Sequence, residues 1–505
     1  MRAKHTRPNS ASHSTPCFPS WRTFLAPLGR RAAALLPSLR QVTLSQIEER
    51  FAPALPPDLL PKPAKGAHSR KRVYTLSRTV WCWIWQILQG HAACREAVRQ
   101  VQALFALRAA GPVSEDTGAY CLAREAVPRE VLEKLLAASA QSVQRAAPAA
   151  PAPCLQGRPV RVVDGSGSRL ADTPANRAAY PPSSSMVEGT GFPLLRLVVL
   201  FCLHSGALLA VVSGSLLDGE WRLWHRLCAA LRSGDIMLGD RAYGNYVVAA
   251  ILRTLGVDLL ATVPARLRRV DFRRAKQRLA SGDALFVWRK SRRASPLLDP
   301  AQWAQLPEEI TVRLLRVSVE RRGFRTHHLI LVTTLLDPQL YPAKELAATH
   351  LRRWRLEMSL DDLKTTLGME HLRTRSPAMV QKDLLIFLIA HNLVRWLMAQ
   401  AASQECVALH SLSFKGTMDA FRQWSQALAQ CRSSKRARLQ LWQQLLAVLA
   451  ADALPHRPGR HEPRAVKKRS KYPHLKTRRR LYQQPPSRNQ RRRAANARRR
   501  SAKQP

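Results

Sequence analysis

The stretch Val160-Arg161-Val162-Val163-Asp164-Gly165-Ser166-Gly167 joins a short apolar run to a carboxylate and then to small residues. β-Branched residues bounded by glycine are typical of a buried strand, so the pattern predicts a strand over 160–163 that ends on Asp164. Residues 236–240 repeat the arrangement and end on Gly239-Asp240. Carboxylates at the ends of neighbouring strands can converge on a hard divalent cation. A single Asp would mean little, because turns favour Asp, but two on neighbouring strands indicate a site.

The order of the surrounding elements predicts a fold class. Apolar runs at 194–203 and 207–212 predict the two strands of a hairpin, and further strands are expected at 236–238 and 258–263, with helices near 221–231 and 246–255. Three strands, helix, strand, helix, strand is the order of a ribonuclease-H-like α/β fold with a mixed sheet. A basic segment and two more strands, at 312–319 and 328–334, interrupt it before a long helix at about 343–367.

Composition indicates the class of partner. The 505 residues include 81 Lys and Arg against 34 Asp and Glu, a formal charge of +47, and 46% of the residues are hydrophobic. That much apolar material excludes a wholly disordered basic chain. The charge indicates a polyanionic partner, either nucleic acid or an anionic membrane surface, and argues against most enzymes of small metabolites.

Membrane and redox signals are weak. No apolar run approaches the roughly 18–20 residues that span a bilayer, so no membrane partner is expected. The nine cysteines include no C-x-x-C pair, which predicts neither a disulfide framework nor a zinc site. A reducing, cytoplasmic compartment is the expected location.

Two segments concentrate the positive charge. One is the tail after residue 456, and the other runs over 266–293 and includes Arg273, Arg274 and Trp288. Cations interleaved with an aromatic side chain suit phosphate contacts and base stacking. An equally supported interpretation of 266–293 is a strand that packs Phe286 or Trp288 into the core and leaves a solvated basic face.

The long helix carries a third candidate carboxylate. Arg353, Glu357 and Lys364 fall within one narrow stripe at about 100° per residue, and His350 lies on the same face. A Glu between two cations beside a buried face can be both ionised and positioned. The simpler interpretation is an i,i+4 Arg–Glu pair that contributes only a few tenths of a kcal/mol.

Taken together, these motifs resemble the DDE transposases of insertion-sequence family four. The resemblance rests on residues 163–167 with Asp172-Thr173-Pro174, on residues 239–244, and on His350-x2-Arg353-x3-Glu357-x6-Lys364. The family signature reads Tyr-x2-Arg-x3-Glu-x6-Lys, so His350 stands where the family has Tyr. There it either bonds a phosphate or weakens that contact. The resemblance covers roughly residues 70–400.

The resemblance implies a cut-and-paste DNA transposase that acts on terminal inverted repeats and then on target DNA. Asp164, Asp240 and Glu357 would bind two divalent ions, usually Mg²⁺ with Mn²⁺ as a substitute. His350, Arg353 and Lys364 would contact DNA phosphates, as would Arg273 and Arg274. Trp288, or second Trp354, would stack on a flipped base. The family further implies a hairpin intermediate and a homodimer in the synaptic complex on double-stranded DNA.

Two other functions stay open at this point. One is a DNA-binding derivative whose catalysis has decayed, and the other is a metal-dependent nuclease of the same fold. A nucleoid-associated place in a bacterial cytoplasm would suit all three. The expected segments are a basic disordered arm at 1–47, a helical DNA-binding domain at 48–145, a Pro/Ala linker at 146–158, a catalytic domain at 159–400 with a β-rich insertion at about 264–340, a C-terminal helical region at 401–455 and a basic disordered tail at 456–505.

Overall fold

The computed structural model describes residues 48, 50–60, 73–107, 111–149, 154–182, 191–264, 270–319, 327–431 and 434–454. The arm expected at 1–47 and the tail expected at 456–505 lie outside the described residues, and so do residues 265–269 of the basic segment. The side chains of residues 354–357, which include Trp354 and Glu357, also lie outside the description.

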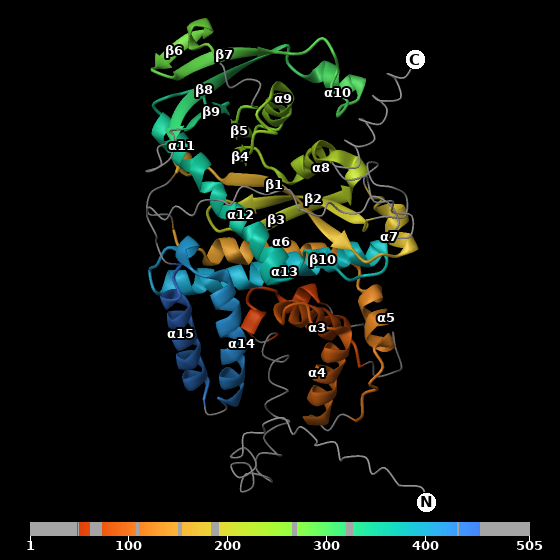
Figure 1. The fold of residues 1–505 in the computed structure, drawn as a ribbon. Coiled ribbons are helices and arrows are strands. Elements are labelled where there is room, and N and C mark those ends of the chain that lie inside the picture. The colour runs from red at the N-terminus through yellow and green to blue at the C-terminus, as the bar shows by residue number, and fades with distance from the viewer. Residues whose placement is uncertain are drawn as a thin grey trace, which may run out of the picture.

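One mixed sheet of ten strands runs through the molecule in the order β3-β2-β1-β4-β5-β9-β8-β7-β6, and β10 pairs with β1 (Figure 1). The strands are β1 Val160–Leu170, β2 Leu194–Cys202, β3 Leu208–Ser215, β4 Ile236–Gly239, β5 Asp258–Thr262, β6 Gln277–Ala280, β7 Asp283–Arg289, β8 Glu309–Val319, β9 His327–Thr333 and β10 His371–Leu372.

The first five strands have the ribonuclease-H-like arrangement that the sequence predicts. β2 is antiparallel to β1 and to β3, whereas β4 is parallel to β1 and to β5. One detail of the prediction is wrong, because β1 does not end on Asp164. Its antiparallel pairing with β2 continues from Asp164↔Val199 to Arg169↔Leu194, so backbone pairing carries the strand through the small residues that follow the aspartate.

The β-rich insertion extends the same sheet instead of forming a separate one. β9 pairs antiparallel with β5 through Leu260↔Thr333, and β8, β7 and β6 follow outward as antiparallel neighbours. The insertion is therefore attached to the core sheet by backbone hydrogen bonds. In Figure 1 it forms the green upper part of the molecule.

Helices cover both faces of the core sheet. α8 (Gly219–Leu227) and α9 (Tyr246–Thr254) pack on one face, and α6 (Arg129–Ala146), α13 (Pro377–Gln404), α11 (Ala343–Arg352) and α12 (Trp354–Asp361) lie on the other. Beyond α13 lies a further layer of helices (Figure 1), namely α3 Leu76–Leu88, α4 Cys94–Leu107, α5 Gly118–Ala126, α14 Phe414–Gln430 and α15 Lys435–Ala451. Two short helices, α7 Pro174–Ala179 and α10 Pro300–Gln305, lie in connections.

α13 forms the centre of the helical layers. Its buried residues lie on all sides of the helix, as expected for a helix that other elements surround. Contrary to the sequence expectation, it is long and apolar enough to cross a membrane, but 94% of its most apolar window is buried inside the protein. That burial is what the core helix of a soluble protein shows.

The N-terminal and C-terminal helices share one apolar core with the sheet. Phe51, Trp83, Phe387 and Leu445 belong to the same buried cluster as Val162 of β1. The division at the Pro/Ala linker, most of which lies outside the described part, stays a prediction.

Candidate active site

The pairing of β1 with β4 brings the two predicted aspartates to the same level of the sheet. The parallel register runs Val160↔Ile236, Arg161↔Met237, Val162↔Leu238. Two residues further along each chain stand Asp164 and Asp240, on neighbouring strands that are about 4.8 Å apart. Strand alternation puts Asp164 on the face of Val162, the face that α13 and α12 cover.

Each aspartate is oriented by a backbone amide that follows it. The Oδ1 atom of Asp164 accepts a hydrogen bond of 2.9 Å from the N–H of Gly165, and Oδ1 of Asp240 accepts one of 2.8 Å from the N–H of Ala242. Bonds of this kind hold the carboxylates in one orientation. Both side chains are half-buried.

The predicted third carboxylate lies on a helix over the same face. α11 and α12 run obliquely in front of the sheet (Figure 1), and Leu346 and Leu360 of these helices belong to the buried cluster that contains Val162. Glu357 belongs to α12, but its side chain is outside the description, so its place in the triad stays a prediction. The long helix expected at about 343–367 consists of α11, α12 and a π-helical turn at Asp362–Thr366.

The donor chemistry of this site fits a hard divalent cation. Asp164 and Asp240 offer carboxylate oxygens, which suit Mg²⁺ or Mn²⁺ and not the soft metals that select thiolates. Among the side chains that the structure describes, no group of three or more His, Cys, Asp or Glu residues could hold a metal ion. Glu357, whose side chain lies outside the description, stays the predicted third ligand.

His350 is held inside the protein. Its side chain is buried, and its Nε2 atom lies 2.9 Å from Oγ1 of Thr262 on β5. Burial, together with the nearby charge of Arg353, lowers the pKa of His350 to about 4. The ring is therefore neutral at pH 7 and forms part of the packing between α11 and the sheet, a position that does not favour the predicted phosphate contact.

The buried imidazole makes stability depend on pH. A histidine with a pKa of 6.5 when unfolded and about 4 when folded costs the folded state roughly 2–3 kcal/mol as the pH falls from 6.5 to 4. His350→Gln keeps a polar side chain that does not titrate. Between pH 6.5 and pH 4 we therefore expect the unfolding free energy of this variant to fall by roughly 2–3 kcal/mol less than that of the wild type. Urea unfolding at neutral and mildly acidic pH measures the difference, and equal losses in the two proteins would contradict this account.

The remaining cations of the signature lie on the same helical run. Arg353 stands at the junction of α11 and α12, and Lys364 stands in the π-helical turn. Both side chains are half-exposed. Short π-helical segments frequently occur at functional sites.

The insertion combines the two interpretations of its basic segment. Trp288 is half-buried and packs against a core cluster, with Ile310 opposite it on β8. The cations around it are exposed, and they include Arg273, Arg274, Lys276, Arg278, Arg289, Arg292 and Arg293. The structure thus gives exposed cations on a segment whose tryptophan is packed on one side and half-buried as a residue.

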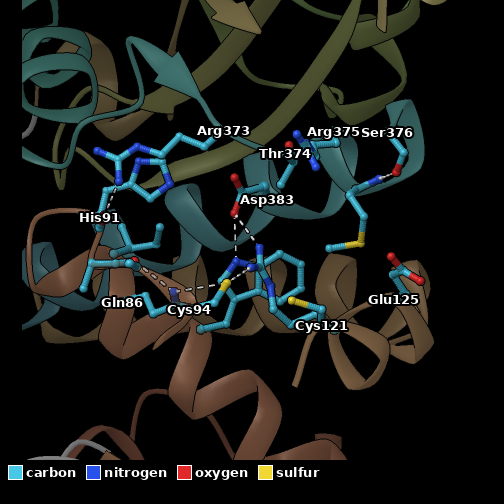
Figure 2. Close-up of a pocket in the computed structure, with 16 residues that line it drawn as sticks. Gln86, His91, Cys94, Cys121, Glu125, Arg373, Thr374, Arg375, Ser376 and Asp383 are labelled. Atoms are coloured by element: carbon cyan, nitrogen blue, oxygen red, sulfur yellow. Dashed lines mark hydrogen bonds and ion pairs between the residues drawn. The ribbon is translucent and has the colours of Figure 1, made fainter. Parts of the chain in front are cut away.

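A cavity of about 520 Å³ lies away from the aspartates, between α3, α5 and the start of α13 (Figure 2). Asp383 lies in its wall, where its Oδ1 atom accepts a 2.8 Å hydrogen bond from Nε1 of Trp83 and lies 3.4 Å from Arg124. The Arg124 guanidinium also stacks 4.0 Å from the centre of the Trp83 ring. None of the predicted site residues lines this cavity.

Two residues near the aspartates were missed by sequence reasoning. Glu220 on α8 and Tyr243 after β4 meet behind Asp164 and Asp240, where the Tyr243 hydroxyl donates a 3.1 Å hydrogen bond to Oε1 of Glu220. The signal that could have found them is the glycine beside each aspartate, Gly165 and Gly239, since a glycine leaves space for another side chain.

Comparison with known proteins shows which proteins this chain is similar to. A family model described as "Transposase DDE domain" matches residues 155–393, which contain both aspartates, Glu357 and Lys364. The chain is similar to "Transposase InsG for insertion sequence element IS4" of Escherichia coli (strain K12), with 26% identity over 409 residues that cover 80% of this chain and 88% of the relative. Among solved structures, a piggyBac transposase synaptic complex with hairpin DNA matches with a TM-score of 0.39 and 10% identity, over 82% of this chain and 85% of that one.

Proposed function

From the premise that the chain is a DDE transposase of the IS4 family, we propose that it moves its own element by a cut-and-paste route. It would cut DNA at the terminal inverted repeats and join the freed 3′ ends to target DNA. The observation that carries the proposal is the register of β1 with β4, which puts Asp164 and Asp240 at the same height on neighbouring strands. The predicted third carboxylate, Glu357, belongs to α12.

The three carboxylates would hold the divalent ions, for which Mg²⁺ is the first candidate and Mn²⁺ a substitute. When bound, two such ions stabilise the charge that develops on the entering and leaving oxygens at phosphorus. The protein's own task is to hold the carboxylates in place. The backbone amides of Gly165 and Ala242 support this, because each bonds to a carboxylate oxygen.

Cations near the triad would hold the phosphates of the element end. Arg353 offers a planar fork that suits two phosphate oxygens, and Lys364 offers a compact charge. The exposed cations of the insertion, among them Arg273 and Arg274, would extend this contact along the duplex. Trp288, or Trp354, would stack on a base extruded from the end.

Salt dependence distinguishes these contacts from ordinary surface charge. Lys364→Ala should weaken binding to an end duplex and reduce the slope of log affinity against log salt by about 0.9, and the double variant Arg273→Ala/Arg274→Ala by about 1.8. Fluorescence anisotropy over a salt series gives the slopes. Lys415→Ala is the control, since Lys415 is an exposed cation on α14 that pairs with Asp419. A slope unchanged from wild type would remove the substituted residue from the DNA contact.

Synapsis of two ends by a homodimer, a hairpin intermediate on the donor side and a cytoplasmic, nucleoid-associated location belong to the same proposal. Each follows from family membership. A native gel of end complexes tests the dimer, and a denaturing gel tests the hairpin, which migrates as one strand of twice the length.

The proposal is tested on the inverted repeats that flank the coding region. A labelled repeat-end duplex is incubated with the wild-type protein, either with Mg²⁺ or with EDTA. We expect cleavage at the repeat end with Mg²⁺ and none with EDTA. Cleavage of an unrelated duplex at the same rate would favour a nuclease, and binding without cleavage would favour a decayed derivative. Absence of flanking repeats would contradict the proposal.

A further inference from the structure

We propose that the hydrogen bond between Tyr243 and Glu220 is a positioning device that fixes the separation of Asp164 and Asp240 from the opposite face of the sheet. The inference rests on the proposed function, because it assigns these aspartates to one cation site. It adds two positioning residues that do not belong to the triad.

The ladder between β1 and β4 ends at Val162↔Leu238, two residues before Asp164 and Asp240. Beyond that point the register of β1 with β4 no longer sets how far apart the two aspartates lie. The contacts of Glu220 and Tyr243 lie at this place.

Glu220 packs against the residue that follows the first aspartate. A Cβ atom at Gly165 would lie 2.8 Å from the carboxyl carbon and from Oε1 of Glu220, which is too close for a real side chain. Successive residues of a strand point to opposite faces, so Gly165 faces α8 while Asp164 faces α12. The glycine in Asp164-Gly165 therefore makes room for the Glu220 carboxylate.

Tyr243 packs in the same way against the residue that precedes the second aspartate. A Cβ atom at Gly239 would lie 2.9 Å from Cβ and Cδ2 of Tyr243. The backbone N–H of Tyr243 donates a 3.2 Å hydrogen bond to the carbonyl of Asp240. Its ring lies among Trp221 and Trp224 of α8, with ring centres 6.4 and 5.9 Å away.

Together these contacts form a continuous bridge. It runs from Gly165 to Glu220, through the 3.1 Å hydrogen bond to Tyr243, and into the turn that holds Asp240. Residues of this kind, behind the ligands of a cation, orient the ligands and tune affinity.

The Tyr243 hydroxyl can act only as the donor in this hydrogen bond when Glu220 is a carboxylate, because a carboxylate only accepts. Tyr243 acts on the aspartates through their backbone and does not touch the reacting atoms.

The test measures Mn²⁺ affinity directly, by isothermal titration calorimetry on the full-length protein. Tyr243→Phe removes one hydroxyl and keeps the ring, and we expect it to bind Mn²⁺ about tenfold more weakly. Glu220→Gln keeps an oxygen that accepts the hydrogen bond, so this single variant should retain an affinity for Mn²⁺ within about twofold of wild type. Gly165→Ala displaces the Glu220 carboxylate and should reproduce the Tyr243→Phe result.

The matched control is Tyr246→Phe. Tyr246 begins α9, and its hydroxyl bonds to the carbonyl of Pro307, away from the aspartates. This control loses one tyrosine hydrogen bond as well, so a general loss of stability would affect both variants. Thermal unfolding of each variant identifies any variant that does not fold. If Tyr243→Phe does not fold, Gly165→Ala takes its place in the comparison.

Wild-type affinity for Mn²⁺ in both Tyr243→Phe and Gly165→Ala would overturn the inference. A tenfold loss of Mn²⁺ affinity in Glu220→Gln would also overturn it. That result would mean that the negative charge of Glu220, and not its hydrogen bond to Tyr243, is what the site needs. Failure of the proposed function gives a different pattern. In that case the wild type binds Mn²⁺ and the variants bind it more weakly, but no protein cuts the end duplex.

Discussion

Asp240→Asn is expected to lower cleavage at the element end by about a thousandfold or more, with binding to the same duplex retained. Asparagine has nearly the shape of aspartate, and its side-chain oxygen can still accept the hydrogen bond from the N–H of Ala242. What it lacks is the negative charge that a divalent cation requires. Single-turnover cleavage and anisotropy with one labelled duplex measure the two effects. Asp164→Asn and Glu357→Gln should lose activity to a similar degree.

Asp299→Asn is the control for this prediction. Asp299 is the N-cap of α10 in the insertion, and asparagine caps helices as well as aspartate does. We expect this variant to cut DNA at the wild-type rate. If cleavage survives Glu357→Gln, the third carboxylate has been assigned to the wrong residue. If it survives Asp240→Asn, the site itself lies elsewhere.

Arg124→Met is expected to have the largest effect on folding. Its guanidinium is the charge partner of Asp383, whose side chain is 1% exposed. Figure 2 labels Asp383 in the wall of the cavity. Removal of one partner of a buried ion pair leaves an uncompensated charge, which costs about 3–5 kcal/mol of unfolding free energy. Since Arg124 belongs to α5 and Asp383 to α13, the loss also loosens the contact of the N-terminal helices with the core.

The pH dependence of this variant has a defined sign. Burial raises the pKa of Asp383 above its ordinary value, and loss of the Arg124 charge raises it further. In the folded variant the Asp383 carboxyl therefore keeps its proton at a pH where the same carboxyl in the unfolded chain has lost it. The destabilisation of Arg124→Met relative to the wild type should grow as the pH rises above about 4. Urea unfolding at two pH values measures it. The double variant Arg124→Met/Asp383→Leu should recover part of the loss, and a loss under about 1 kcal/mol in the single variant would contradict the account.

Local patterns of sequence were enough to predict the first five strands and the order in which they alternate with helices. The apolar runs of β2 and β3, and of β4 and β5, are short and bounded by turn residues, so each strand is encoded where it stands. The full length of β1, which extends to Leu170, could not be predicted from its own residues. Residues 165–169 are mostly small or polar, and only their pairing with Leu194 to Val198 makes them a strand.

Long-range packing also explains what was missed at the site. The helical spacing put His350 on the same face as the signature residues, where a DNA contact was expected. In the structure its ring lies in the interior and contacts Thr262 on β5. Glu220 looks like an ordinary first-turn acid of a helix, and only the fold brings it against Gly165. The sequence analysis expected no apolar stretch as long as α13, and only the surrounding helices show that this helix is buried. The sequence could place Asp164 and Asp240 on neighbouring strands, because the apolar runs before them define where β1 and β4 begin.

The most direct test of the central claim is a strand-transfer measurement. Wild-type protein, a labelled inverted-repeat end and a supercoiled target plasmid are incubated with Mg²⁺, and covalent joining of label to plasmid is followed on a denaturing gel. The account predicts joined product with the wild type and none with Asp164→Asn, Asp240→Asn or Glu357→Gln. Cleaved ends that never join the plasmid would contradict transposition and leave a nuclease, and joining by the Asp240→Asn variant would contradict the proposed site.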